Sequence, residues 1–169
     1  MVLFGSIHKN APIQQFALEL KTYSEKISKN IKLVILGRSG KEAERWSDEF
    51  RNLNMEVDSF GEQSDINISK ILGESDYGIT TSAFDILEKS GSVAAMVEHG
   101  LNIICVATGI NAYKIPNTNK IKGVYNYSPG NLEKFFESEL DLSLKSSFCS
   151  VKETSIKLIN SFRDSTRNQ

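Results

Sequence analysis

The chain has 169 residues, of which 40% are hydrophobic and 24% are charged, and its formal net charge is −1 at pH 7. This length is typical of one domain with a substantial core. The near-neutral charge excludes a general electrostatic attraction to nucleic acid or to anionic membranes, so any anion site must be local.

Apolar runs and cysteines indicate the compartment in which the protein resides. The longest apolar runs, 33–36 and 103–107, are strand-sized and too short to cross a membrane. Residues 1–5 lack the basic start and the long apolar region of a signal peptide. Cys105 and Cys149 form no disulfide framework, and the apolar run around Cys105 predicts a packed thiol. We therefore expect a cytoplasmic protein without a transmembrane segment.

The first half of the chain predicts strands alternating with helices. Residues 2–5 form a short apolar strand that ends in glycine. A helix follows at 12–27, because proline suits the first helical turn and apolar residues then repeat at helical spacing. Residues 31–37 are continuously apolar, as in strands buried on both faces of a parallel sheet, and an amphipathic helix follows at 41–53.

The same alternation continues to residue 107. A strand is predicted at 55–60, a short helix at 65–73 and a fourth strand at 77–80. Residues 92–99 then form a helix that a glycine closes, and 102–107 form a buried strand. This order predicts an α/β fold, a Rossmann-like open parallel sheet with right-handed crossovers and helices on both faces.

Beyond residue 107 the periodic signal weakens. We expect there a last strand, a helix that begins at a proline, and a final amphipathic helix, at 123–127, 129–140 and 151–162. The polar tail after these elements is expected to fray. The whole chain, 1–169, is therefore assigned to a single domain with its core in 2–107 and additional C-terminal elements in 121–165.

Ligands of open parallel sheets bind outside the carboxyl ends of the strands, so the residues after each predicted strand are candidates for a site. Several of them are cationic or titratable: His8, Lys9, Arg38, Lys41 and Lys89. Together with helix N-termini, these cations would suit a diphosphate. The alternative is that they are solvated loop charges, and His8 in particular is either a phosphate contact, an acid or base, or a surface histidine.

The segment 88–104 carries the most informative motif of the chain. Glu88 precedes a small-residue turn of Ser90, Gly91 and Ser92, which opens a short helix. The free backbone N–H groups of such a helix start can bind phosphate, although an acidic residue there is also ordinary helix N-terminal chemistry. At the other end of this helix, His99 is predicted to act as a capping residue.

Several sharper motifs are excluded. Residues 37–41 (Gly-Arg-Ser-Gly-Lys) resemble part of a P-loop, but Ile35 stands where that motif requires its first glycine. No G-x-G-x-x-G follows the first strand and no G-x-S-x-G is present, so neither a dinucleotide fingerprint nor a serine nucleophile elbow is predicted. The two histidines have no cysteine pair at metal-ligand spacing, and no metal site is expected.

In the order of these elements and motifs, residues 2–107 resemble the C-terminal, donor-binding domain of GT-B glycosyltransferases. The resemblance implies that the donor phosphates are held by the loops after the first two strands, through Gly5, Ser6, Lys9 and Arg38. His8 is a further candidate for substrate binding because it lies in the same first loop. It places the nucleobase near the residues after the third strand, Phe60, Gly61 and Glu62. The donor sugar and diphosphate would contact Glu88, Ser90, Gly91 and Ser92, with Glu88 as the candidate catalytic residue.

This sequence departs from the family pattern at the ribose contact. Many retaining members carry two glutamates eight positions apart, the second of which binds the ribose hydroxyls. Counted from Glu88, that position holds Met96. An alignment on the helix-closing glycine instead places Ala95 there. In addition, Ser6 replaces the usual arginine of the first loop, and Asn102 replaces a common proline.

The resemblance implies a glycosyltransferase domain that binds a UDP- or GDP-sugar and requires no metal or other cofactor. The sugar would be transferred to an acceptor held by a separate or missing N-terminal domain or a companion subunit. Nucleic acid is not an expected partner, and peripheral membrane association stays open. Two alternatives also stay open: a non-catalytic GT-B-like subunit that has lost the donor site, and a sugar-nucleotide epimerase of the same fold.

Overall fold

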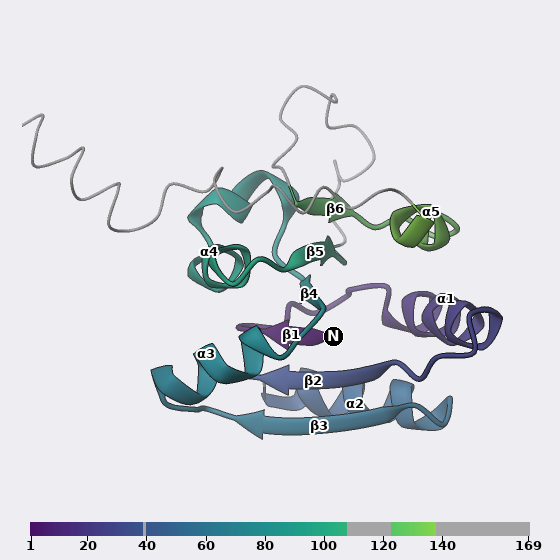
Figure 1. The fold of residues 1–169 in the computed structure, drawn as a ribbon, viewed down its shortest axis with the longest axis horizontal. Helices are drawn as coiled ribbons and strands as arrows, with labels where there is room; N and C mark the ends of the chain where they lie inside the picture. The colour runs from purple at the N-terminus through teal and green to yellow at the C-terminus, as the bar shows by residue number, and fades with distance from the viewer. Residues whose placement is uncertain (39, 108–122, 138–169) are drawn as a thin grey trace, which may run out of the picture.

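A computed structural model describes residues 1–38, 40–107 and 123–137 and shows a Rossmann-like α/β fold (Figure 1). Six strands form one open sheet in the order β3-β2-β1-β4-β5-β6, and every neighbouring pair is parallel. The strands are β1 (Val2–Phe4), β2 (Lys32–Leu36), β3 (Glu56–Gly61), β4 (Tyr77–Thr80), β5 (Asn102–Cys105) and β6 (Val124–Asn126). The predicted fold class is thus confirmed.

Helices cover both faces of the sheet. They are α1 (Ile13–Lys26), α2 (Gly40–Asn52), α3 (Asp65–Gly73), the 3-10 helix η1 (Phe84–Lys89), α4 (Gly91–Glu98) and α5 (Leu132–Glu137). The core on one face includes residues of α1, α2 and α5, whereas the core on the other includes residues of α3, η1 and α4 (Figure 1). Successive strand residues divide between the two cores, as Val2 and Leu3 do, because strand side chains alternate. None of the described helices combines the length and apolar character needed to cross a membrane.

The structure differs from the predicted elements in two places. Residues 84–89 were not expected to be helical, but they form η1, because a short 3-10 helix leaves no 3.6-residue period in the sequence. The predicted helix at 129–140 does not begin at Pro129, because Gly130 has φ +84° and the Asn131 side chain accepts a hydrogen bond from the Ser128 N–H (3.0 Å). This turn delays α5 to Leu132. The predicted helix at 151–162 lies outside the described residues.

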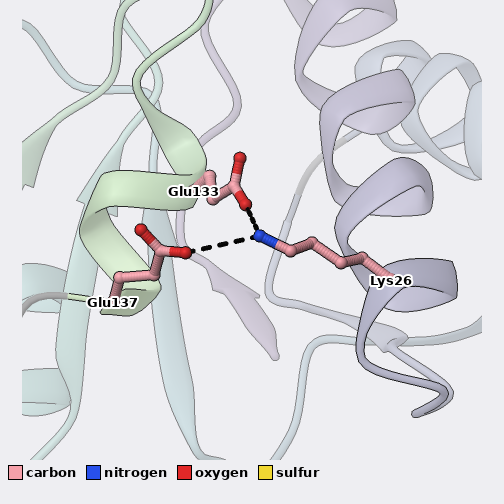
Figure 2. A network of polar contacts seen from close by, with 3 residues as sticks. All are labelled: Lys26, Glu133 and Glu137. Atoms are coloured by element: carbon pink, nitrogen blue, oxygen red, sulfur yellow. Dashed lines mark hydrogen bonds and ion pairs between the residues drawn. The ribbon is translucent and has the colours of Figure 1, made fainter.

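α5 is anchored to α1 on one face of the sheet. The rings of Tyr23 and Phe136 stack with centroids 4.5 Å apart. The ammonium group of Lys26 bridges the carboxylates of Glu133 and Glu137 (Figure 2). Because all three charged side chains are 48–59% exposed, the ion pairs add little to stability, and the aromatic packing holds the helix.

Cys105 confirms the predicted packed thiol and carries a prediction about alkaline stability. Its side chain is fully buried and its Sγ donates to the carbonyl of Ser82 at 3.3 Å. Burial raises the pKa of the Cys105 thiol from 9.0 to about 12, so the folded state keeps the proton when the unfolded state has lost it. We therefore expect the free energy of unfolding to fall as the pH rises through this interval. Urea titrations at stepped alkaline pH measure the effect, and Cys105→Ala should show a shallower alkaline decline.

Candidate functional site

The order of the strands reverses between β1 and β4: β2 and β3 are added on one side of β1, and β4, β5 and β6 are added on the other. β1 has β2 on one side and β4 on the other, and their connections lead to helices on opposite faces of the sheet. Open α/β sheets bind their ligands at such a topological switch, outside the carboxyl ends of the two strands, and this region is called the crevice below. The loop after β1 and the start of α4 border this crevice and contain most of the predicted site residues.

Gly5 and Ser92 meet at this crevice. Gly5 follows β1 with φ +97°, and a Cβ atom added to it would lie 2.7 Å from the Ser92 Oγ and 2.9 Å from its Cβ. No side chain fits between them without displacement of Ser92. The backbone of the first loop therefore lies directly against the first turn of α4, and the structure brings together two predicted site residues that are distant in sequence.

Glycines with positive φ follow or end three adjacent strands. Gly61 (φ +62°) ends β3, Gly37 (+106°) follows β2, and Gly5 follows β1. Their backbones are linked, since the Gly37 N–H donates to the Gly61 carbonyl at 2.8 Å and the Gly5 N–H donates to the Leu36 carbonyl at 3.0 Å. In this glycine row, Gly61, Gly37 and Gly5, the missing Cβ atoms allow close packing of the backbone. Ser92 takes the space at Gly5 and the Gly5 backbone takes it at Gly37, whereas nothing lies within 4 Å of a Cβ atom added to Gly61.

The start of α4 adds an electropositive helix end to the crevice. Ser90 is the N-cap, and its Oγ accepts from the Val93 N–H at 3.4 Å and lies 3.1 Å from the Ser92 Oγ. The N–H groups of a first helical turn, here those of Gly91 and Ser92, have no partners within the helix. Glu88 is exposed on η1, directly before this turn. The predicted helix start is confirmed, and its ligand stays a prediction.

Ser6, His8 and Lys9 follow Gly5 in the β1–α1 loop, and all three are exposed. Within the described part of the chain, neither Lys9 nor Glu88 forms an ion pair. Both charges are thus available at the edge of the crevice.

A second group of predicted residues lies farther along the same edge, at the ends of β2 and β3. The Arg38 guanidinium forms an ion pair with the Glu62 carboxylate, and its Nη2 and Nε lie 2.5 and 2.8 Å from the Glu62 Oε1. These two residues and Gly61 line an open cavity of about 660 Å³ between α2 and the sheet edge. Phe60 is 46% exposed and does not line this cavity, because successive strand side chains point to opposite faces.

The structure distinguishes the two positions considered for a ribose-binding carboxylate. Met96 is fully buried, and a Cβ atom added to Gly78 on β4 would lie 2.6 Å from its Sδ. Position 96 therefore faces the core and not the crevice. Ala95 is only half buried. Of these two positions, only Ala95 is reached by solvent.

His99 is the C-cap of α4, as predicted from the glycine that follows it. Its Nδ1 lies 2.8 Å from the Ala95 carbonyl oxygen, which fixes the proton on this nitrogen. Its Nε2 then accepts from the Ser69 hydroxyl at 2.8 Å in the neutral form. His99 thus links α4 to α3 and is not a site residue. Within 1–38, 40–107 and 123–137, no three His, Cys, Asp or Glu residues gather as metal ligands.

Sequence reasoning gave no specific role to two hydroxyl groups at this edge, although Thr81 was a candidate because it follows the fourth predicted strand. Ser47 on α2 is 4% exposed and lines the cavity beside Arg38 and Glu62. Thr81 directly follows β4 and contacts the β1–α1 loop. The position of Thr81 after a predicted strand was a usable signal. The helical spacing of Ser47 from Ala43 and Phe50 was another, since it places Ser47 on the buried face of α2.

The chain was also compared with known proteins. No protein-family model matches it, and no curated protein matches it in sequence.

Proposed function

We propose that this chain binds a nucleoside diphosphate sugar at the carboxyl edge of its sheet, as the donor-binding half of a glycosyltransferase. The observation that supports it best is the contact of Gly5 with Ser92 at the topological switch. This contact places Gly5, at the start of the β1–α1 loop, against the N-terminus of α4, and helix N-termini attract phosphate groups.

The charges and the cavity suit the parts of such a ligand. The diphosphate would lie between the first loop and α4, where Lys9 supplies a cation and the Gly91 and Ser92 N–H groups supply donors. The nucleoside would extend toward the cavity beside Arg38 and Glu62, whose volume of about 660 Å³ lies in the range of small-molecule sites.

In the proposed reaction, the bond from the anomeric carbon to the diphosphate oxygen breaks and a bond to an acceptor oxygen forms. The electron pair leaves with the diphosphate, and the acceptor proton passes to a base. Lys9 and the helix dipole would stabilise the charge on the leaving group, which is an electrostatic contribution to catalysis. Glu88 would position the donor sugar from its exposed place on η1. A second domain or subunit would hold the acceptor.

Titration with UDP and GDP tests this proposal, with ADP as a comparison. We expect dissociation constants of about 0.1–1 mM, or roughly −4 to −5.5 kcal/mol, because only half of the cleft contacts the ligand. In NMR spectra the amides of Gly5, Ser6, Gly91 and Ser92 should shift. Absence of shifts in these loops at millimolar nucleotide would reject the proposal.

Charge-removing variants test the cations separately. Lys9→Met and Arg38→Met are each expected to weaken UDP binding about tenfold, since a hydrogen bond to a charged group contributes about 1.5–3 kcal/mol. Lys70→Met is the matched control, because Lys70 is equally exposed but lies in the last turn of α3, away from the carboxyl edge. Equal losses in all three variants would indicate nonspecific attraction.

A non-catalytic subunit of the same fold is the second candidate. The observation that favours it is the burial of Met96, which leaves the spacing counted from Glu88 without a ribose-binding carboxylate. In that case the nucleotides should cause no shifts, and the chain should instead copurify with a companion subunit.

A further inference from the structure

Thr81 joins the two halves of the crevice through a single hydroxyl group. It follows β4 directly and is 3% exposed. Its Oγ1 accepts a hydrogen bond from the His8 N–H at 2.8 Å and lies 3.3 Å from the carbonyl oxygen of Ser6, to which it donates. Both partners belong to the β1–α1 loop, so one side chain uses its donor and an acceptor lone pair on the same loop.

This contact lies where the sheet no longer holds the two strands together. In the pairing of β1 with β4, Val2 is opposite Gly78 and Leu3 is opposite Ile79. Beyond these pairs, the segments that follow the two strands separate toward opposite faces of the sheet. The Thr81 hydroxyl bridges the loops just past that point. It replaces the ladder hydrogen bonds that the diverging backbones can no longer form.

Hydrogen bonds of Thr80 fix the backbone at the end of β4, directly before Thr81. The neighbouring Thr80 carbonyl accepts from the Val106 N–H at 2.7 Å, and the Thr80 Oγ1 accepts from the Ser82 N–H at 3.3 Å. Thr80 and Thr81 are both nearly fully buried. The end of β4 is therefore tied to the segment after β5, and Thr81 transfers this rigidity to the first loop.

On the loop side, the bridge adds two hydrogen bonds to the contacts that order this short segment. Ile7 inserts into the core at 9% exposure, and the Thr81 hydroxyl holds the backbone on either side of it. Gly5, which precedes the segment, rests on Ser92. The loop therefore has a defined course past the start of α4, and Lys9 leaves it from a fixed backbone.

We infer that Thr81 is a positioning residue for the anion site, and that it acts through the β1–α1 loop without contacting the ligand. The inference rests on the proposed function. Loss of the hydroxyl would leave the His8 N–H and the Ser6 carbonyl without this partner and would release the loop. A released loop has to be ordered again when a phosphate binds, which lowers affinity.

The test compares Thr81→Val, which keeps the shape but lacks the hydroxyl, with Thr81→Ser, which keeps the hydroxyl. UDP and inorganic pyrophosphate serve as probes. Thr81→Val is expected to bind both probes about tenfold more weakly and to show faster amide exchange at His8, whereas Thr81→Ser should stay within about twofold of the parent chain. Thr81→Ala replaces Thr81→Val if the latter does not fold.

Thr22→Val is the matched control, because it removes an exposed hydroxyl that bonds only within α1, to the Leu18 carbonyl. It should change neither binding nor exchange at His8. If Thr81→Val lowers the melting temperature but binds UDP and pyrophosphate like the parent chain, the role of Thr81 is structural only and the inference is wrong. If the parent chain itself binds neither probe, the proposed function fails first and the positioning role fails with it.

Discussion

Gly5→Ala is expected to destabilise the protein by about 2–5 kcal/mol and to abolish nucleotide binding. A left-handed backbone costs a residue with a side chain about 1–2 kcal/mol, and overpacking adds about 1–3 kcal/mol. Both terms apply, because Gly5 has φ +97° and its added methyl group would lie 2.7 Å from the Ser92 Oγ. Urea unfolding measures the stability loss, and UDP titration of the folded fraction measures binding.

Gly61→Ala separates the two contributions. Gly61 also has a positive φ, +62°, but an added Cβ atom would meet nothing within 4 Å, so only the backbone cost of about 1–2 kcal/mol remains. The double variant Gly5→Ala with Ser92→Gly removes both atoms that the new methyl group would strike. It should recover part of the loss in a double-mutant cycle. Additive effects of the two substitutions would show that Gly5 and Ser92 are not in contact.

Met96→Glu is expected to destabilise the chain by about 3–5 kcal/mol, because it buries a charge without a partner. Met96 is fully buried against Gly78 in a cluster of apolar residues, which offers a carboxylate no charged partner. The pKa of the introduced carboxyl group should rise, so the loss should be smaller in acid than at neutral pH. Urea unfolding at both pH values measures the difference.

Two substitutions control for volume and position. Met96→Leu keeps the apolar volume and should cost less than about 1.5 kcal/mol. Ala95→Glu places the same carboxylate one residue earlier, at a half-buried position, and should cost about 1 kcal/mol. If Met96→Glu were tolerated as well as Ala95→Glu, position 96 would face the crevice, and a ribose-binding role for that position would return.

The elements that the sequence predicts best are those whose period is undisturbed. The bounds expected for α3 and β4 agree with the structure, since Asp65–Gly73 and Tyr77–Thr80 are flanked by polar or small residues. Errors arose where side-chain or glycine geometry overrides periodicity. The Asn131 side chain and the positive φ of Gly130 delay α5, and neither effect leaves a periodic signal.

The candidate site, too, was predicted from the sequence only in part. Parallel strands place their carboxyl ends at one edge, so the residues after each strand were predicted to lie along it. The choice among those residues needed the structure. Position 96 illustrates this, because counting from Glu88 suggests a ligand-facing residue, whereas the rotation of α4 turns Met96 into the core.

By itself, the sequence determined the α/β class, the alternation of its elements and the edge on which a ligand would bind, because these depend on local periodicity and on the handedness of crossovers. Only the tertiary structure decided which residues at that edge touch. The contact of Gly5 with Ser92 and the bridge from Thr81 to Ser6 and His8 join segments far apart in the chain. Such contacts depend on strand order and on the rotation of each helix, and neither quantity is encoded in any single stretch of residues.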